Sequence, residues 1–235
     1  MLNIGCGLSI GNAKGIQPAS SWPSVSDIPP GMLVLDADGV VKKCLLAPGT
    51  IWQTRASAAD NSWISICLHT PTGRLVAVAE TGTDNRVMTS DDGGITWQTR
   101  VSAADNYWWS ICLHTPTGRL VAVAYSGTGN RVMTSDDGGI TWVTRASAAD
   151  NYWRSICLHT PTGRLVAVAS SGTGNRVMIS DDGGITWVTR ASAADNSWLF
   201  ICLHTPTGRL VAVAYTGTGN RVMTSDETEK VLVKI

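Results

Sequence analysis

Short apolar segments separated by turn residues recur along most of the chain. Within residues 61–105, four such segments are rich in β-branched residues and are bounded by clusters of Gly, Pro, Asn and Asp. No window shows an apolar stripe at 3.6-residue spacing that is free of Gly or Pro, so no helix is expected. The pattern predicts four strands in this unit, at Trp63–His69, Arg74–Glu80, Arg86–Ser90 and Thr96–Val101.

The unit is repeated with a step of 45 residues. Four histidines mark the step, at His69, His114, His159 and His204. Four tryptophans keep the same step, at Trp63, Trp108, Trp153 and Trp198. A period of about 40 to 50 residues indicates propeller blades or helical solenoids, and short β segments decide for blades. We therefore expect an all-β propeller made of four-stranded antiparallel blades.

Two incomplete units flank the full repeats and decide the blade count. Residues 20–60 resemble a degenerate blade, in which Trp22 aligns with Trp63 and Trp52 aligns with Trp97. The last unit departs from the repeat at Glu227, so its fourth strand is expected either from the C-terminal segment or from residues 1–19, which could close the ring. The preferred interpretation is one five-bladed domain over 1–235, with blades at 20–60, 61–105, 106–150, 151–195 and 196–235. The alternative is a four-bladed ring with residues 1–46 as an appendage.

The segment SDDGGITW occurs three times, at residues 90–97, 135–142 and 180–187. Its serine, second aspartate and paired glycines are typical of a sharp turn whose side-chain oxygens hold backbone N–H groups. The spacing Ser-x-Asp-x-Gly-x-Thr-Trp resembles the Asp-box, or BNR repeat, of sialidases, related β-propellers and propeller lectins. That resemblance implies a structural turn between the two outer strands of a blade, away from any active site.

Composition narrows the partners. Eighteen basic and eighteen acidic residues leave no formal net charge, which argues against nucleic acid as a partner. No apolar run approaches a membrane span and the N-terminus lacks a secretory pattern, so we expect no membrane insertion and a cytoplasmic or virion-associated protein. The six cysteines are expected to be reduced, with Cys67, Cys112, Cys157 and Cys202 buried between blades.

Two motifs suggest metal chemistry but have simpler interpretations. The four equivalent histidines could line a channel, but each precedes a Thr-Pro-Thr-Gly turn, where an imidazole commonly bonds to the turn. DADG at Asp36–Gly39 lacks the remaining ligands of a calcium loop and is better interpreted as a hairpin turn. Neither a metal nor a cofactor is expected.

Differences between the copies point to one face. Residues 106–150 and 151–195 differ only at Trp109/Arg154, Tyr125/Ser170 and Thr134/Ile179. Most differences flank the loops that join the fourth strand to the next first strand and the second strand to the third, and these loops share one face of an antiparallel blade. Aromatic and Arg side chains beside Asp and Asn suit a sugar. The expected ligand-binding residues are Trp63, Asp105, Asn106, Tyr107, Trp108, Trp109, Tyr125, Tyr152, Trp153, Arg154, Trp198 and Tyr215. For the four repeated tryptophans, packing between blades is an equally good interpretation.

Function follows from the repetition. Near-identical blades give near-identical clefts, which favours multivalent binding of a glycan or glycoconjugate by a lectin-like protein that could also oligomerise. The alternative is a structural or protein-interaction propeller, such as a phage-tail or assembly component. The arginine triad, tyrosine–glutamate pair and acid aspartate that the sialidase resemblance would imply are not matched, so the sequence predicts no catalytic residues and no enzyme.

Overall fold

The computed structural model describes residues 33–35, 41–43 and 52–225. The chain divides into two compact units, Met1–Thr54 and Arg55–Ile235. In the first unit, β1 (Leu33–Leu35) and β2 (Val41–Lys43) form an antiparallel pair. The predicted first blade at 20–60 and the closing strand at either terminus lie mostly or wholly outside the described residues, so the count of five blades stays a prediction.

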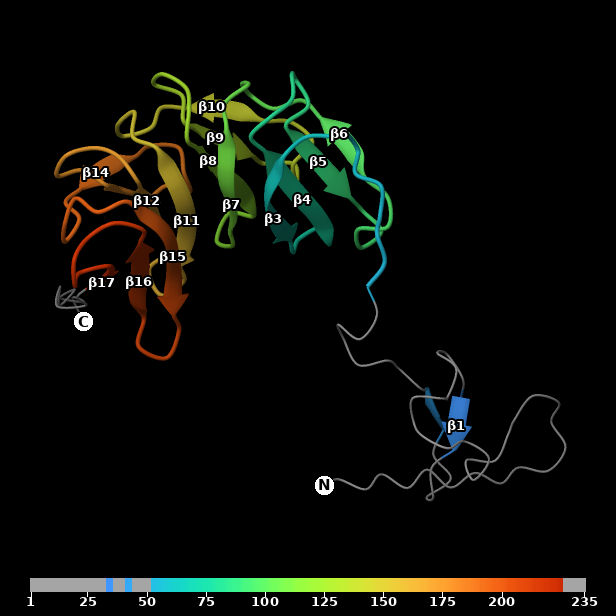
Figure 1. Cartoon of the computed structure of the whole chain (residues 1–235). Coiled ribbons are helices and arrows are strands. Elements are labelled where there is room, and N and C mark those ends of the chain that lie inside the picture. Colours follow the sequence, from blue (N-terminus) through green and yellow to red (C-terminus); the bar gives the residue numbers. More distant parts are fainter. Residues whose placement is uncertain (1–32, 36–40, 44–51, 226–235) are drawn as a thin grey trace, which may run out of the picture. The chain divides into compact units, whose positions relative to one another are not determined.

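Four antiparallel sheets make up the second unit, in chain order and side by side (Figure 1). The first contains β3 (Trp63–His69), β4 (Arg74–Ala79), β5 (Val87–Ser90) and β6 (Gln98–Arg100). The second contains β7 (Trp108–His114), β8 (Arg119–Ala124), β9 (Val132–Ser135) and β10 (Val143–Arg145). The third contains β11 (Trp153–His159), β12 (Arg164–Ala169), β13 (Val177–Ser180) and β14 (Val188–Arg190). The fourth contains β15 (Trp198–His204), β16 (Arg209–Ala214) and β17 (Val222–Thr224).

Each full sheet is a blade of the expected kind, and the all-β class is confirmed. Strands follow one another in sequence across each sheet, as a meander joined by short turns. The predicted strands agree with β3 to β6 to within one residue, except that the outer strand β6 is shorter, at Gln98–Arg100. Within the described residues the fourth sheet has three strands.

The core lies between neighbouring sheets, because β3 packs on β7, β7 on β11 and β11 on β15. Each junction joins two different faces. The face that a sheet turns toward the following sheet, here called the back face, presents three valines, which in the first sheet are Val76, Val78 and Val87. The face turned toward the preceding sheet, the front face, presents a Trp, Ile and Leu set, which in the second sheet includes Trp108, Ile111 and Leu113. The small Ala–Val strand in the middle of each sheet is thereby covered on both sides, as its unbroken apolar run predicts.

The first strand of each sheet in the second unit contains a β-bulge that the sequence did not reveal. Trp63 pairs with Ala79 but Ser65 pairs with Val78, so residue 64 has no partner across the ladder. The same interruption follows Trp108, Trp153 and Trp198. A bulge releases one side chain from the alternation of the strand and re-aims it. The bulged positions hold Ile64, Trp109, Arg154 and Leu199.

Candidate functional site

The bulge residues of the second and third sheets meet at the end of their junction. The Arg154 guanidinium carbon lies 4.2 Å from the centre of the Trp109 ring and 4.4 Å from that of Tyr125. Trp109 comes from β7, Arg154 from β11, and Tyr125 directly follows β8. The guanidinium is thus in cation–π contact with two rings, an arrangement worth about 0.5 to 2 kcal/mol per ring according to its exposure.

Tyrosines extend this cluster. Tyr125 stacks on Tyr152 with ring centres 4.1 Å apart and lies 6.5 Å from Tyr107 in a nearly parallel orientation. Two further guanidinium groups lie beside the outer rings, with Arg86 5.5 Å from Tyr107 and Arg131 5.6 Å from Tyr152. We call Tyr107, Trp109, Tyr125, Tyr152 and Arg154 the aromatic–arginine cluster.

The polar groups of the cluster are only partly used within the protein. Arg154 donates from Nε to the hydroxyl of Ser170 at 3.0 Å. Burial lowers the pKa of Arg154 below its ordinary value, although Tyr125 and Glu80 act in the opposite direction. The group stays charged at neutral pH because an arginine titrates so far above it. The buried indole N–H of Trp109 has no hydrogen-bond partner among the described residues.

Loops from two connections build this face, as the sequence predicts. Asn106, which precedes β7, donates to the backbone oxygen of Asn130 in the β8–β9 loop at 2.9 Å. Asp105 accepts from the N–H of Asp84 at 2.9 Å and lies 3.5 Å from Arg86. Asp105 and Asn106 therefore help to fix these loops in place.

The repeated tryptophans belong to the core. Trp108, Trp153 and Trp198 have no exposed surface. Their indole N–H groups, like that of Trp63, donate to an alanine carbonyl four residues earlier. The three buried rings offer no surface to a ligand, so the packing alternative describes them correctly. Tyr215, the counterpart of Tyr125 in the fourth unit, is 75% exposed and takes no part in the ring contacts of the cluster.

The cluster occurs once among the described repeats. The bulge residue is Trp109 in the second sheet and Arg154 in the third. These two side chains meet at the junction of the two sheets. The flanking sheets have Ile64 and Leu199 instead. The described repeats therefore differ from one another at this face, and equivalent clefts at every blade stay a prediction.

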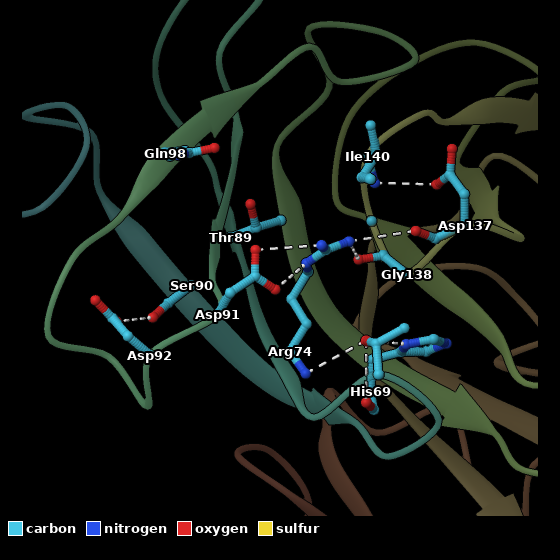
Figure 2. A network of polar contacts seen from close by, with 12 residues as sticks. His69, Arg74, Thr89, Ser90, Asp91, Asp92, Gln98, Asp137, Gly138 and Ile140 are labelled. Atoms are coloured by element: carbon cyan, nitrogen blue, oxygen red, sulfur yellow. Dashed lines mark hydrogen bonds and ion pairs between the residues drawn. The ribbon is translucent and has the colours of Figure 1, made fainter.

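The opposite face holds the sheets together (Figure 2). Arg74 pairs with Asp91 at 2.7 Å and donates from Nη1 to the backbone oxygens of Asp137 and Gly138 in the next sheet. His69 accepts from Thr72 at Nδ1 and donates from Nε2 to the carbonyl of Gly118 at 2.8 Å. A carbonyl can only accept, which fixes the imidazole proton on Nε2. The histidines thus act in turns and junctions, and no metal-binding group of His, Cys, Asp or Glu occurs among the described residues.

The cysteines form a row across the first strands. Cys67, Cys112 and Cys157 are partly buried, and Cys67 and Cys112 pack against the core between sheets, whereas Cys202 is exposed. The expected burial between blades is therefore incomplete for three cysteines and wrong for Cys202. Burial, with the neighbouring Cys67 and Cys157 thiols, raises the pKa of Cys112 to about 12. No disulfide joins these four cysteines, Cys6 and Cys44 lie outside the described residues, and the reduced state stays a prediction. No helix among the described residues is long and apolar enough to cross a membrane.

The sequence and the fold were compared with those of known proteins. Residues 88–99, 133–144 and 178–189 match the family model described as BNR/Asp-box repeat. No curated protein matches the sequence. Among solved structures, virginiamycin B lyase from Staphylococcus aureus is similar with a TM-score of 0.52 and 12% identity, over 82% of this chain and 61% of that chain. A structure of YCF48 bound to D1 peptide has a TM-score of 0.53 and 17% identity, over 85% and 58%. A GH74 enzyme from Niastella koreensis has a TM-score of 0.51 and 15% identity, over 65% and 26%.

These comparisons correct one expectation. The chain spans about three fifths of the length of the first two structures, and at such identities the likeness shows the fold alone. The prediction that the chain is not an enzyme is wrong as an inference from its architecture, because structures with this fold include a lyase and a GH74 enzyme. Absence of the sialidase residues argues only against sialidase chemistry. The narrower likeness to sialidases is not confirmed.

Proposed function

The chain is a BNR-repeat protein of the β-propeller type, and from this premise we propose that it binds carbohydrate through the aromatic–arginine cluster. The observation that carries the proposal is the contact of Trp109, Arg154 and Tyr125 at one junction. Sugar recognition commonly combines a flat apolar ring with a directional polar group, and this cluster supplies both on the face opposite the Asp-box turns.

The chemistry of Arg154 narrows the ligand to glycans that carry an acidic group. Its Nε is bonded to Ser170, which leaves the other guanidinium N–H groups for a ligand. A guanidinium presents paired N–H donors that match a carboxylate or sulfate. The aromatic neighbours lower the local dielectric, and this strengthens the hydrogen bonds that these donors make. We therefore expect uronic, sialic or sulfated sugars to bind more tightly than neutral ones.

A glycan array tests this proposal. Wild-type protein should bind acidic glycans, and Trp109→Ala should weaken that binding by about tenfold or more, as loss of a central aromatic contact commonly does. Leu199→Ala is the matched control, because Leu199 occupies the same bulge position outside the cluster. Arg154→Gln should remove the preference for acidic over neutral glycans. A folded Trp109→Ala protein with an unchanged array profile would contradict the proposal.

A second candidate is binding of a peptide. Tyr, Trp and Arg also dominate the energetics of protein interfaces, and the row of tyrosines beside Arg86 and Arg131 offers an extended surface of that composition. YCF48 with its D1 peptide shows that a related fold takes a peptide in that protein. Selection from a peptide display library that enriches sequences dependent on Trp109, together with a blank glycan array, would favour this candidate.

A further inference from the structure

Each end of the row of four sheets has an open face, and the equivalent face of the inner sheets is covered by a neighbouring sheet. Every inner junction joins the back face of one sheet to the front face of the next. Among the described residues, nothing packs on the front face of the first sheet or on the back face of the fourth. These two end faces have nearly the same residues as the faces that join inside the row.

The front face of the first sheet is apolar and open. Ile66 is 56% exposed and Leu68 is 46% exposed. Their counterparts in the second and third sheets, Ile111, Leu113, Ile156 and Leu158, are at most 8% exposed. A Cβ added to Gly93 in the first Asp-box would meet nothing within 4 Å, whereas a Cβ at the equivalent Gly138 would lie 2.9 Å from His69 of the preceding sheet. The front face of the first sheet therefore has the apolar residues of an inner junction but no sheet packed on it among the described residues.

The back face of the fourth sheet is the matching surface. Val213 is 43% exposed and Val222 is 60% exposed. Their counterparts Val78, Val87, Val123 and Val132 have no exposed surface. Removing such apolar surface from water is favourable, so an open face of this kind favours a partner that covers it.

Polar groups at the two ends also match. At the inner junctions His69, His114 and His159 each donate from Nε2 to a glycine carbonyl of the next sheet, at 2.7 to 2.8 Å. His204 keeps its Nδ1 contact with Thr207, while its Nε2 has no such acceptor among the described residues. The acceptor equivalent to Gly118 for that nitrogen is Gly73, which lies at the open end of the first sheet.

We propose that the back face of the fourth sheet binds the front face of the first sheet of a second copy of this chain. The contact continues the three inner junctions with the same valines on one side and the same Ile and Leu on the other. It is head to tail, so two copies close a ring if the rotation permits and otherwise extend into a chain. The one departure is Phe200, which replaces the junction serine of the other sheets and adds exposed apolar surface to the back face.

The N-terminal segment is a poorer match for the same faces. Asp27 or Ile28 stands where the repeats have the junction histidine. A second copy provides the groups that the inner junctions use, apart from the junction serine that Phe200 replaces.

Analytical ultracentrifugation of the full chain tests the contact. Wild type should form species that are multiples of 24.9 kDa and that dissociate on dilution. Ile66→Glu and Val213→Glu should each sediment as monomers, because a carboxylate would be buried in the contact. Ile95→Glu is the control: Ile95 is 54% exposed, and its counterparts Ile140 and Ile185 remain exposed inside the row, at 40% and 39%.

A mixture of the two variants gives the decisive result. Ile66→Glu keeps an intact back face and Val213→Glu keeps an intact front face, so one sound junction forms between them and a 1:1 dimer should appear. Circular dichroism checks that each variant is folded, and if one is not, the other decides. Monomeric wild type at every concentration would overturn the proposal and favour closure by residues 20–60. Assembly that survives in both folded variants would also overturn it.

Discussion

The second aspartate of each Asp-box organises its turn through several hydrogen bonds. Asp137 accepts from the N–H groups of Ile140 and Thr141 and from the hydroxyls of Ser135 and Thr141. Asp137→Ala leaves these donors without their acceptor and should lower the free energy of unfolding by about 2 to 3 kcal/mol. Asp136→Ala is the matched control, because it removes only a surface ion pair with Arg119, worth about 1 kcal/mol or less. Equal losses in urea denaturation would contradict this account.

The same carboxylates predict the response to acid. Burial raises the pKa of Asp137 and Asp182. Hydrogen bonds from threonine, serine and the backbone together lower the pKa by more than burial raises it, so the net shift is downward. Hydrogen bonds with Thr96 also lower the pKa of Asp92. A depressed pKa in the folded state contributes stability above the unfolded value of about 4, and that stability is lost as pH falls through the folded pKa.

Unfolding measured by urea titration from pH 6 to pH 2 should therefore show stability falling below about pH 4. Replacing Asp92, Asp137 and Asp182 together by Asn should lower stability at pH 6 and flatten its decline in acid. A triple variant with the same slope as wild type would show that other groups carry the acid response.

At the residue scale, the sequence located the cluster but not its construction. Variation at Trp109, Arg154 and Tyr125 indicated positions outside the tightly packed core, since such a core could not accept both Trp and an unpaired Arg, and in the structure all three are half-buried. The bulge that brings Trp109 and Arg154 together has no signal in a single sequence, because it depends on how the strands pair. For the same reason, the regular step of Trp108 and Trp153 did not distinguish core packing from ligand binding.

At the scale of the sheets, glycine in the Asp-box is needed for the junction as well as for the turn. Gly139 has φ of +89°, and a Cβ there would lie 2.9 Å from Val76 of the preceding sheet. Gly94 has the same backbone conformation, but a Cβ would meet only Leu75 and Trp97, at 3.6 Å. Both alanine variants incur the strain of positive φ, and only Gly139→Ala adds a collision, so it should melt several degrees lower. Equal melting temperatures in dilute protein would contradict this packing.

The last unit offers a complementary test. A groove with a volume of about 180 Å³ lies between the third and fourth sheets, lined by Val168, Val177, Ile201, Leu210 and Met223. At the preceding junction, Trp187 of the Asp-box packs into the equivalent core. Replacing residues 226–232 by the sequence DDGGITW should place an indole there and raise the melting temperature by roughly 4 to 8 °C, for about 2 kcal/mol of burial. The graft with alanine in place of the final tryptophan is the control, and an equal gain from both would show that the groove is not filled.

Strand positions were predictable because each depends on local pattern. The alternation of apolar segments with Gly and Pro turns placed β3, β4 and β5 to within one residue. Blade closure depends on contacts between segments far apart in the chain, and the repeat pattern cannot report these. The short outer strand β6 reflects the same limit, since the ends of an edge strand are set by its one neighbour.

Across the second unit, the two faces of the sheets have different tasks. The face with the Asp-box turns carries the His and Arg contacts that join neighbouring sheets, and their recurrence makes the row regular. The opposite face carries the loops in which the copies differ, and there the aromatic–arginine cluster breaks the regularity at one junction. A binding site can therefore diverge without loss of the contacts that hold the sheets together.

The central claim is that ligand binding depends on one composite site and not on every repeat. The most direct measurement is the affinity of Tyr125→Ala and Tyr215→Ala for an acidic glycan, by titration calorimetry. Both tyrosines directly follow the second strand of their sheets, but only Tyr125 contacts Trp109, Tyr152 and Arg154. We predict that Tyr125→Ala weakens binding by about tenfold or more while Tyr215→Ala leaves it unchanged. Equal effects of the two substitutions, in proteins that remain folded, would contradict the claim.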